Sequence, residues 1–98
     1  MLILGIKVQI YFPYIHSLKD KRKEVRSLID RLEKKFNLSV REVADQDQWQ
    51  SFVLGISFTA LKKSEAIEMR EKLEQFIFDE VNGEILSFDW DLFSPEDY

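Results

Sequence analysis

A run of cationic side chains lies between the first strand and the first helix that this sequence predicts. The run reads His16-Ser17-Leu18-Lys19-Asp20-Lys21-Arg22-Lys23. A helix that begins within it presents free backbone N–H groups together with several positive charges, an arrangement that binds phosphates and other anions. A second run, Asp45-Gln46-Asp47-Gln48-Trp49-Gln50, is expected at the same end of the molecule. Neither run is a catalytic signature, so both predict binding rather than catalysis.

The cations continue along the predicted helix as a stripe, because they recur at the i, i+3, i+4 and i+7 spacing that shares one helical face. Its members are Lys19, Arg22, Lys23 and Arg26. A stripe of this kind can follow a phosphate backbone, and we count Lys21, His16 and Ser17 among the candidate contacts. The alternative is a solvated helical face that is balanced by Asp20, Glu24 and Asp30.

Two aromatic residues and a glutamine are candidates for contacts to bases or to a protein partner. They are Tyr11, Trp49 and Gln50. By strand alternation, Tyr11 and Trp49 are both predicted to point to the helix-free face of two neighbouring strands. RNA-recognition motifs use aromatic side chains on these two strands to stack bases. The sequence lacks the RNP1 pattern of those motifs, so a packed aromatic pair or a dimer contact is the alternative.

A polar cluster of Asp45, Gln46 and Asp47 follows the second predicted strand. These residue types form turns, and the carboxylates are expected to pair with cations at the start of the helix. A third interpretation is a small-ligand or metal-dependent enzyme that uses His16 with the two aspartates. One His with two carboxylates is a poor zinc site, and the sequence has no Cys and no Gly-rich phosphate loop. We therefore predict no catalytic residue, no bound metal and no cofactor.

The charge of the chain is unevenly distributed. Its 98 residues carry a net charge of -4, yet residues 1–41 contain ten Lys or Arg against four Asp or Glu. Residues 42–98 contain four Lys or Arg against fourteen Asp or Glu. The acidic average therefore coexists with a basic first helix, and it does not exclude RNA or a ribosomal subunit as a partner. No feature of the sequence is specific for DNA.

Length and composition predict a single globular domain over residues 1–98. With 45% hydrophobic residues and eight Phe, the chain can bury a core. Lys7 and Gln9 interrupt the apolar N-terminal segment, so it is interpreted as a strand rather than a signal peptide. No apolar run approaches the roughly 18 residues of a membrane span. The expected location is the cytoplasm, without a membrane partner.

Hydropathy patterns predict four strands and two helices. In chain order they are a strand over residues 2–12 that Pro13 ends, a helix over 18–36 capped by Ser17, strands over 38–45 and 49–60, a helix capped by Ser64, and a strand with Leu86, Phe88, Trp90 and Leu92 inward. Residues 93–98 are expected to form a frayed acidic tail.

This order, βαββαβ, predicts an α+β fold. Each strand has one apolar face and each helix one apolar stripe, so the simplest arrangement is a ferredoxin-like sandwich. In it, a four-stranded antiparallel sheet of order 4-1-3-2 carries both helices on one face. Right-handed crossovers then place loop 13–17, hairpin 45–48 and the turn Asn82-Gly83 at one end. An apolar patch of Ile3, Val43, Val53 and Ile85 is predicted on the open face, which favours a homodimer.

Three segments resemble the YlxP-like bacterial family, a domain of unknown function (DUF503). They are the run from His16 to Arg22, the helix end Lys35-Phe36-Asn37-Leu38-Ser39-Val40, and the run from Asp45 to Gln50. The resemblance covers nearly the whole chain and implies a ferredoxin-like fold in a cytosolic bacterial protein. Genes of the family commonly lie among transcription-termination, translation-initiation and ribosome-maturation genes, which implies a role near RNA or the ribosome. This chain departs from the family in its aromatic, acidic end, residues 88–98.

The leading hypothesis from the sequence is therefore a non-enzymatic RNA- or ribosome-associated binding module that uses the basic helix N-terminus. The alternative is a protein-interaction or homodimerisation module that acts through the open sheet face without nucleic acid.

Overall fold

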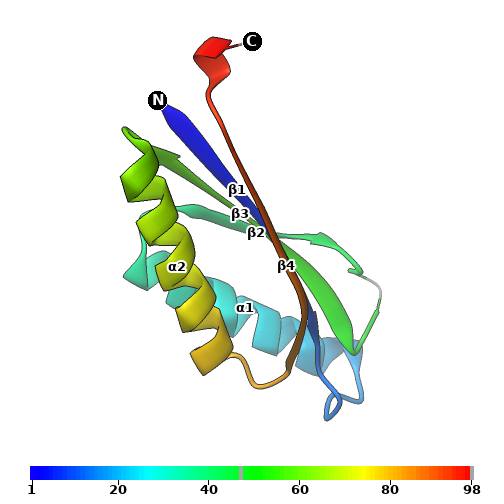
Figure 1. Cartoon of the computed structure of the whole chain (residues 1–98). Coiled ribbons are helices and arrows are strands. Elements are labelled where there is room, and N and C mark those ends of the chain that lie inside the picture. The colour runs from blue at the N-terminus through cyan, green and yellow to red at the C-terminus, as the bar shows by residue number, and fades with distance from the viewer. Residues whose placement is uncertain (47, 98) are drawn as a thin grey trace.

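Four antiparallel strands form one sheet in the order β2-β3-β1-β4, and two helices pack on one face of it (Figure 1). The computed structural model describes residues 1–46 and 48–97. Its elements are β1 (Leu2–Tyr11), α1 (Leu18–Lys35), β2 (Ser39–Ala44), β3 (Ser51–Ala60), α2 (Lys63–Glu80), β4 (Glu84–Phe93) and a 3-10 turn η1 (Pro95–Asp97). The predicted βαββαβ sandwich with strand order 4-1-3-2 is confirmed.

The core lies between the sheet and the two helices, and the alternation of β1 determines its central layer. Every second residue from Leu4 to Ile10 is buried, and so is Phe12 just beyond the strand. From the helices, Leu28 of α1 and Leu73 of α2 meet this layer and are fully buried. Burial of one such side chain stabilises the fold by about 1.5–3 kcal/mol. Because strands and helices contribute to the same core, they form one packed unit.

The first helix begins where the sequence predicts and ends one residue earlier. The Ser17 hydroxyl accepts a hydrogen bond from the Asp20 amide at 3.1 Å, so Ser17 is the expected N-cap. Phe36 is the C-cap, and its amide donates to the Leu32 carbonyl. The second helix differs from the prediction. It begins at Lys63 rather than after a Ser64 cap, and the Glu65 carboxylate accepts from the Leu61 amide at 2.8 Å instead.

The last strand contains an irregularity that the alternation pattern does not predict. The register between β1 and β4 shifts between Gln9 and Ile10. An extra residue in a strand reverses which side chains face inward beyond it. As a result Ile85 packs against the core, whereas Leu86, predicted to point inward, is exposed. The predicted inward positions Phe88 and Leu92 are correct.

The C-terminal segment, predicted from the sequence as a frayed tail over residues 93–98, forms regular structure through Asp97. Strand β4 continues to Phe93, and η1 follows it. The Glu96 carboxylate lies 3.1 Å from the Met1 amine and also accepts from the Ser94 hydroxyl. These two contacts, the Ser94 hydrogen bond first, lower the pKa of Glu96 to about 2. Tyr98 lies outside the described residues.

Three connections meet at one end of the sheet, as predicted (Figure 1). The Phe12 amide donates to the Gln50 carbonyl at 2.6 Å, and the Gln50 side chain donates to the Pro13 carbonyl at 3.3 Å. A Cβ at Gly83 would lie 2.6 Å from the Tyr11 carbonyl oxygen, so only glycine fits this close approach. We call this region the loop end. No helix in residues 1–46 and 48–97 is long and apolar enough to cross a membrane.

Candidate functional site

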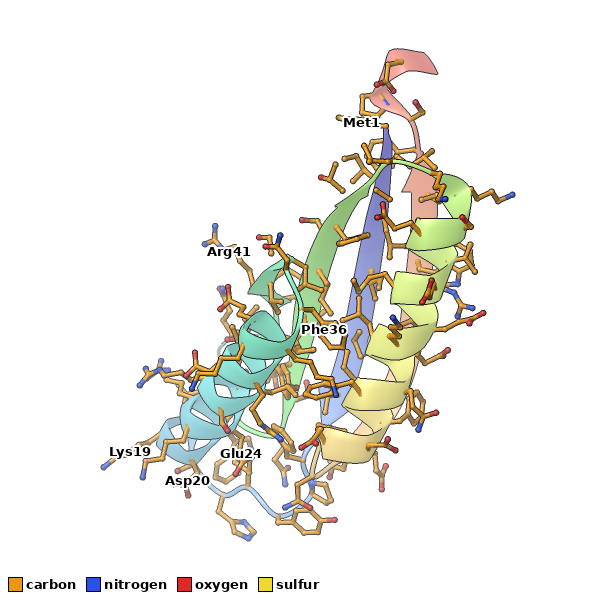
Figure 2. All side chains as sticks on the ribbon, turned by 90° about the vertical axis from the view of Figure 1, so that its left-hand side faces the viewer. Met1, Lys19, Asp20, Glu24, Phe36 and Arg41 are labelled. Carbon is orange, nitrogen blue, oxygen red and sulfur yellow. The ribbon has the colours of Figure 1, made fainter. Side chains whose placement is uncertain are left out.

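The basic stripe, defined as Lys19, Arg22, Lys23 and Arg26, is exposed along α1. Its four side chains line a shallow groove of about 220 Å³. A second groove of about 370 Å³ continues from Lys23 and Arg26 toward Lys34, and Asp30 adds one carboxylate to its lining. Figure 2 shows Lys19 extending away from the body of the molecule at the start of the helix. The predicted spacing therefore produces one accessible cationic surface.

The stripe keeps its charge within the described part of the chain. None of its four cations has an ion-pair partner among residues 1–46 and 48–97. Other cations are neutralised: Arg31 lies 2.8 Å from Glu80, Arg70 lies 3.2 Å from Glu74, and Lys72 lies 3.0 Å from Glu68. The Asp45 carboxylate, expected to pair with the helix cations, instead accepts from the Ser51 hydroxyl at 2.9 Å.

Lys21 belongs to the same run in sequence but not to the stripe, and its prediction as a phosphate contact is wrong. The residue is fully buried. Its ammonium group lies 2.9 Å from Glu42 Oε2, an ion pair without hydrogen-bond alignment, and it donates to the carbonyls of Asp45 and Gln46. Lys21 therefore anchors the first turn of α1 to the β2–β3 connection. An alternating charge pattern gives no sign of this burial, because it depends on which element packs against the helix.

The residues at the helix N-terminus have separate roles. His16 is exposed in the loop before α1. The Ser17 hydroxyl is occupied by its cap bond to Asp20, so Ser17 positions the helix start rather than offering a free group. Asp20 itself carries a negative charge in the first turn, which complements the positive end of the helix dipole.

The aromatic candidates are not arranged as the alternation predicts. Strand β3 begins at Ser51, so Trp49 lies in the preceding loop, where 47% of its surface is exposed. Tyr11 is half-buried at the end of β1, opposite Ser51. No ring contact joins Tyr11 and Trp49 in the described part of the structure; the ring pair at this end is Phe12 with Phe52, inside the core. Gln50, a predicted contact residue, ties two loops together through its hydrogen bonds.

The polar cluster after β2 is mainly a folded turn. Asp45 has a φ of 62°, the left-handed conformation that Asp tolerates better than most residues. The Gln46 side chain donates to the Glu42 carbonyl at 3.5 Å. Asp47, the third member of the predicted cluster, lies outside the described residues.

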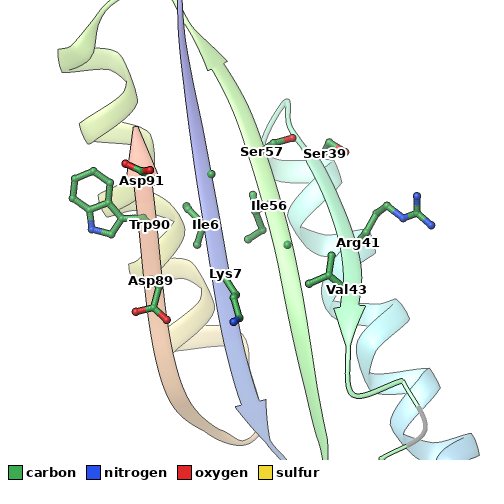
Figure 3. Close-up of a pocket in the computed structure, with 12 residues that line it drawn as sticks. Ile6, Lys7, Ser39, Arg41, Val43, Ile56, Ser57, Asp89, Trp90 and Asp91 are labelled. Carbon is green, nitrogen blue, oxygen red and sulfur yellow. The ribbon is translucent and has the colours of Figure 1, made fainter. Parts of the chain in front are cut away.

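A second candidate region, the open sheet face, carries a hollow of about 580 Å³ (Figure 3). It runs over the middle of all four strands, and Gly5 and Gly55 form its floor on the two central ones. The predicted apolar patch is only partly present here. Val53 is buried, with 4% of its surface exposed, and Ile85 faces the core, whereas Val43 remains 54% exposed. The small residues at outward strand positions are the sequence signal for this hollow. They are Gly5, Gly55, Ser39 and Ser57.

The charged residues of this face come from three strands. Lys7 lies on β1 and Arg41 on β2, whereas Asp89 and Asp91 lie on β4. None of the four has an ion-pair partner within residues 1–46 and 48–97.

Comparison with known proteins gives consistent results. A family model described as "Protein of unknown function (DUF503)" matches residues 3–90. The chain is also 30% identical, over 76 residues, to the uncharacterized protein YlxP of Bacillus subtilis (strain 168). That alignment covers 76% of this chain and 83% of the Bacillus protein.

Proposed function

The chain belongs to DUF503, a family of proteins of unknown function, and we propose that it is a non-enzymatic RNA-binding module. The basic stripe contacts the phosphate backbone of RNA, either free or exposed on a ribosomal subunit. This is the leading hypothesis from the sequence, with Lys21 removed from the contact surface because it is buried.

One observation carries the proposal: the stripe is exposed and has no carboxylate partner in the described structure, whereas other cations of the chain do. The rise of an α-helix places Lys19 and Arg26 about 10 Å apart along the axis. A rigid row of positive charges over that length can neutralise successive phosphates, and the release of their counterions drives binding.

Residues of the loop end support the same surface. His16 is exposed just before the stripe, and Trp49 is exposed in the loop before β3. An exposed indole is suited to stacking on an unpaired base, since every base has a π-face. The expected target is therefore single-stranded or looped RNA, with phosphates on α1 and one base on Trp49.

The decisive experiment reverses charge on the stripe. Arg22→Glu with Arg26→Glu is expected to weaken binding to a labelled single-stranded RNA and to lower the slope of log affinity against log salt by roughly one unit for each phosphate that is no longer neutralised. The matched control is Lys62→Glu with Lys63→Glu, two exposed cations at the start of α2. Fluorescence anisotropy over a salt series measures both. Equal weakening in both variants would indicate that only net charge matters, and an unchanged affinity in the first would remove this surface.

A second measurement concerns the ribosome. Co-sedimentation with separated ribosomal subunits, at low and at physiological salt, is expected to show salt-sensitive association that is absent in the stripe variant. If the wild type sediments with neither subunit but binds free RNA, the ribosomal part of the proposal fails and the RNA part stands.

The alternative from the sequence, a protein-interaction module, is favoured by a different observation. Val43 and the four charged residues of the open sheet face have no helix above them. This alternative involves none of the stripe residues, so the two surfaces can be tested separately.

A further inference from the structure

The charges of the open sheet face are ordered by strand register. Reading across the sheet from β2 to β4, one row contains Arg41, Gly55, Lys7 and Asp89. The adjacent row contains Ser39, Ser57, Gly5 and Asp91. One edge strand therefore carries a cation, the other edge strand carries two anions, and small residues lie between them. Figure 3 shows Arg41 projecting past the edge of β2 and both aspartates on β4 at the opposite side.

The middle of this face is open for an identifiable reason. No atom lies within 4 Å of the position that a Cβ of Gly5 would occupy. At Gly55 the nearest atom to such a Cβ is Val43 Cγ1, at 2.8 Å, so the Val43 side chain leans over this glycine. The hollow of about 580 Å³ thus has an apolar wall on the β2 side and bare backbone on the β1 side.

We propose that the open sheet face binds a second copy of this chain, related to the first by a two-fold axis that runs along the strands. This rotation places β2 of one copy over β4 of the other. Arg41 then faces Asp89 of the second copy, and symmetry makes this ion pair twice. Lys7 of each copy meets Val43 and Gly55 of the other, so its aliphatic stem covers apolar surface.

Charge selects this axis over the other two-fold that could join two sheet faces. A two-fold axis that is perpendicular to the strands and parallel to the sheet would place β4 of one copy over β4 of the other. Asp89 and Asp91 of the two copies would then lie close to each other. Like charges across an interface destabilise it, whereas opposite charges fix its register. Only the axis along the strands places the cation Arg41 of one copy opposite the anion Asp89 of the other.

The sheet edges favour face-to-face contact over edge-to-edge pairing. Both edge strands carry a register shift, β2 between Glu42 and Ala44 and β4 opposite Gln9 and Ile10. Such bulges interrupt the row of free backbone groups that an added strand would need. The face itself is large enough: three strands have ten residues, giving an area of about 33 Å by 19 Å. Two copies would bury on the order of 1,200 Å² in total, at the lower end for stable interfaces.

The test is a charge-swap mixing experiment followed by sedimentation equilibrium over a concentration series. Arg41→Glu alone and Asp89→Arg alone each create two like-charge pairs across the proposed interface. Each is expected to weaken self-association by about tenfold or more. An equimolar mixture of the two variants is expected to form a heterodimer, because like-charge pairs between positions 41 and 89 occur only in the two homodimers.

 In the heterodimer the reversed side chain at position 41 of one variant faces the reversed side chain at position 89 of the other, and the unaltered Arg41 and Asp89 face each other. Both pairs are then complementary, so the mixture is expected to associate as readily as the wild type. Lys62→Glu, a charge change away from this face, is the matched control.

Rescue by mixing cannot come from misfolded variants, so it distinguishes a broken ion pair from a damaged fold. A second variant, Gly5→Gln, places a side chain in the hollow at a position where a Cβ meets no atom of its own chain within 4 Å. It is expected to prevent dimerisation while leaving the circular dichroism spectrum unchanged. The proposal is overturned if the wild type stays monomeric throughout the series, or if the mixture associates no better than the single variants. None of these residues belongs to the basic stripe, so either result leaves the RNA proposal to its own test.

Discussion

The basic stripe and the open sheet face are two charged surfaces built in different ways. The stripe has charges of one sign on a single helix, where local sequence determines their spacing. The open face has charges of both signs on different strands, and only the sheet register brings them into rows. A surface of one sign suits a polyanion, whereas a surface with both signs at opposite edges suits another copy of itself. The two proposals therefore concern separate surfaces of one small fold.

The largest expected effect concerns Lys21, which separates structural from accessible cations in the same run. Lys21→Met leaves Glu42 and two carbonyls of the hairpin without their partner, so the free energy of unfolding is expected to fall by about 2–4 kcal/mol. Lys19→Met, at an exposed position, is expected to change it by less than about 0.5 kcal/mol. Urea denaturation measures both. If Lys21→Met keeps its stability but binds RNA more weakly, Lys21 belongs to the stripe after all.

A smaller difference in stability is expected between alanine substitutions at two glycines. Gly83 lies in the closely packed loop end, and Gly5 lies under the open space above the sheet face. Gly83→Ala places a methyl group 2.6 Å from the Tyr11 carbonyl oxygen and 2.7 Å from the Phe12 ring, and we expect the fold to be destabilised by about 1–3 kcal/mol. At Gly5 the same substitution meets no atom within 4 Å, so it is expected to be neutral or to stabilise by up to about 1 kcal/mol. Thermal unfolding of the two variants compares them directly. At a protein concentration low enough to keep the chain monomeric, equal costs would contradict the open space above Gly5 within a single chain.

The smallest expected effect is the titration of Glu96, which lies outside both the basic stripe and the open sheet face. The pKa of Glu96 is lowered from its ordinary value of 4.5 to about 2. A carboxylate with a lowered folded-state pKa stabilises the fold above its unfolded-state value, and that contribution disappears as the pH falls. Release of the C-terminal turn from the Met1 amine is therefore expected between about pH 4.5 and pH 2. Side-chain NMR titration of Glu96 follows it, and Glu96→Gln is expected to abolish the transition.

The sequence predicts local interactions well but the ends and faces of strands less well, and particular residues show why. Ser17 is recognisable as a cap because a cap is a local interaction over three residues. Alternation assigns Ile85 and Leu86 to the wrong faces because a bulge near them reverses it, and nothing within the strand itself signals that bulge. Trp49 is predicted to lie on a strand that in fact begins two residues later, so its expected pairing with Tyr11 does not follow.

By itself, the sequence determined the order of strands and helices, the strand arrangement that buries their apolar faces, and the spacing of the cations along α1. These are local or pattern-based properties, and the periodicities of helix and strand are sufficient to express them. The tertiary structure alone decided that Lys21 is buried against Glu42, that Val53 is covered while Val43 is not, and that Arg41, Lys7 and Asp89 share a row. Each of these depends on contacts between residues far apart in the chain, which are set by packing and register rather than by local sequence.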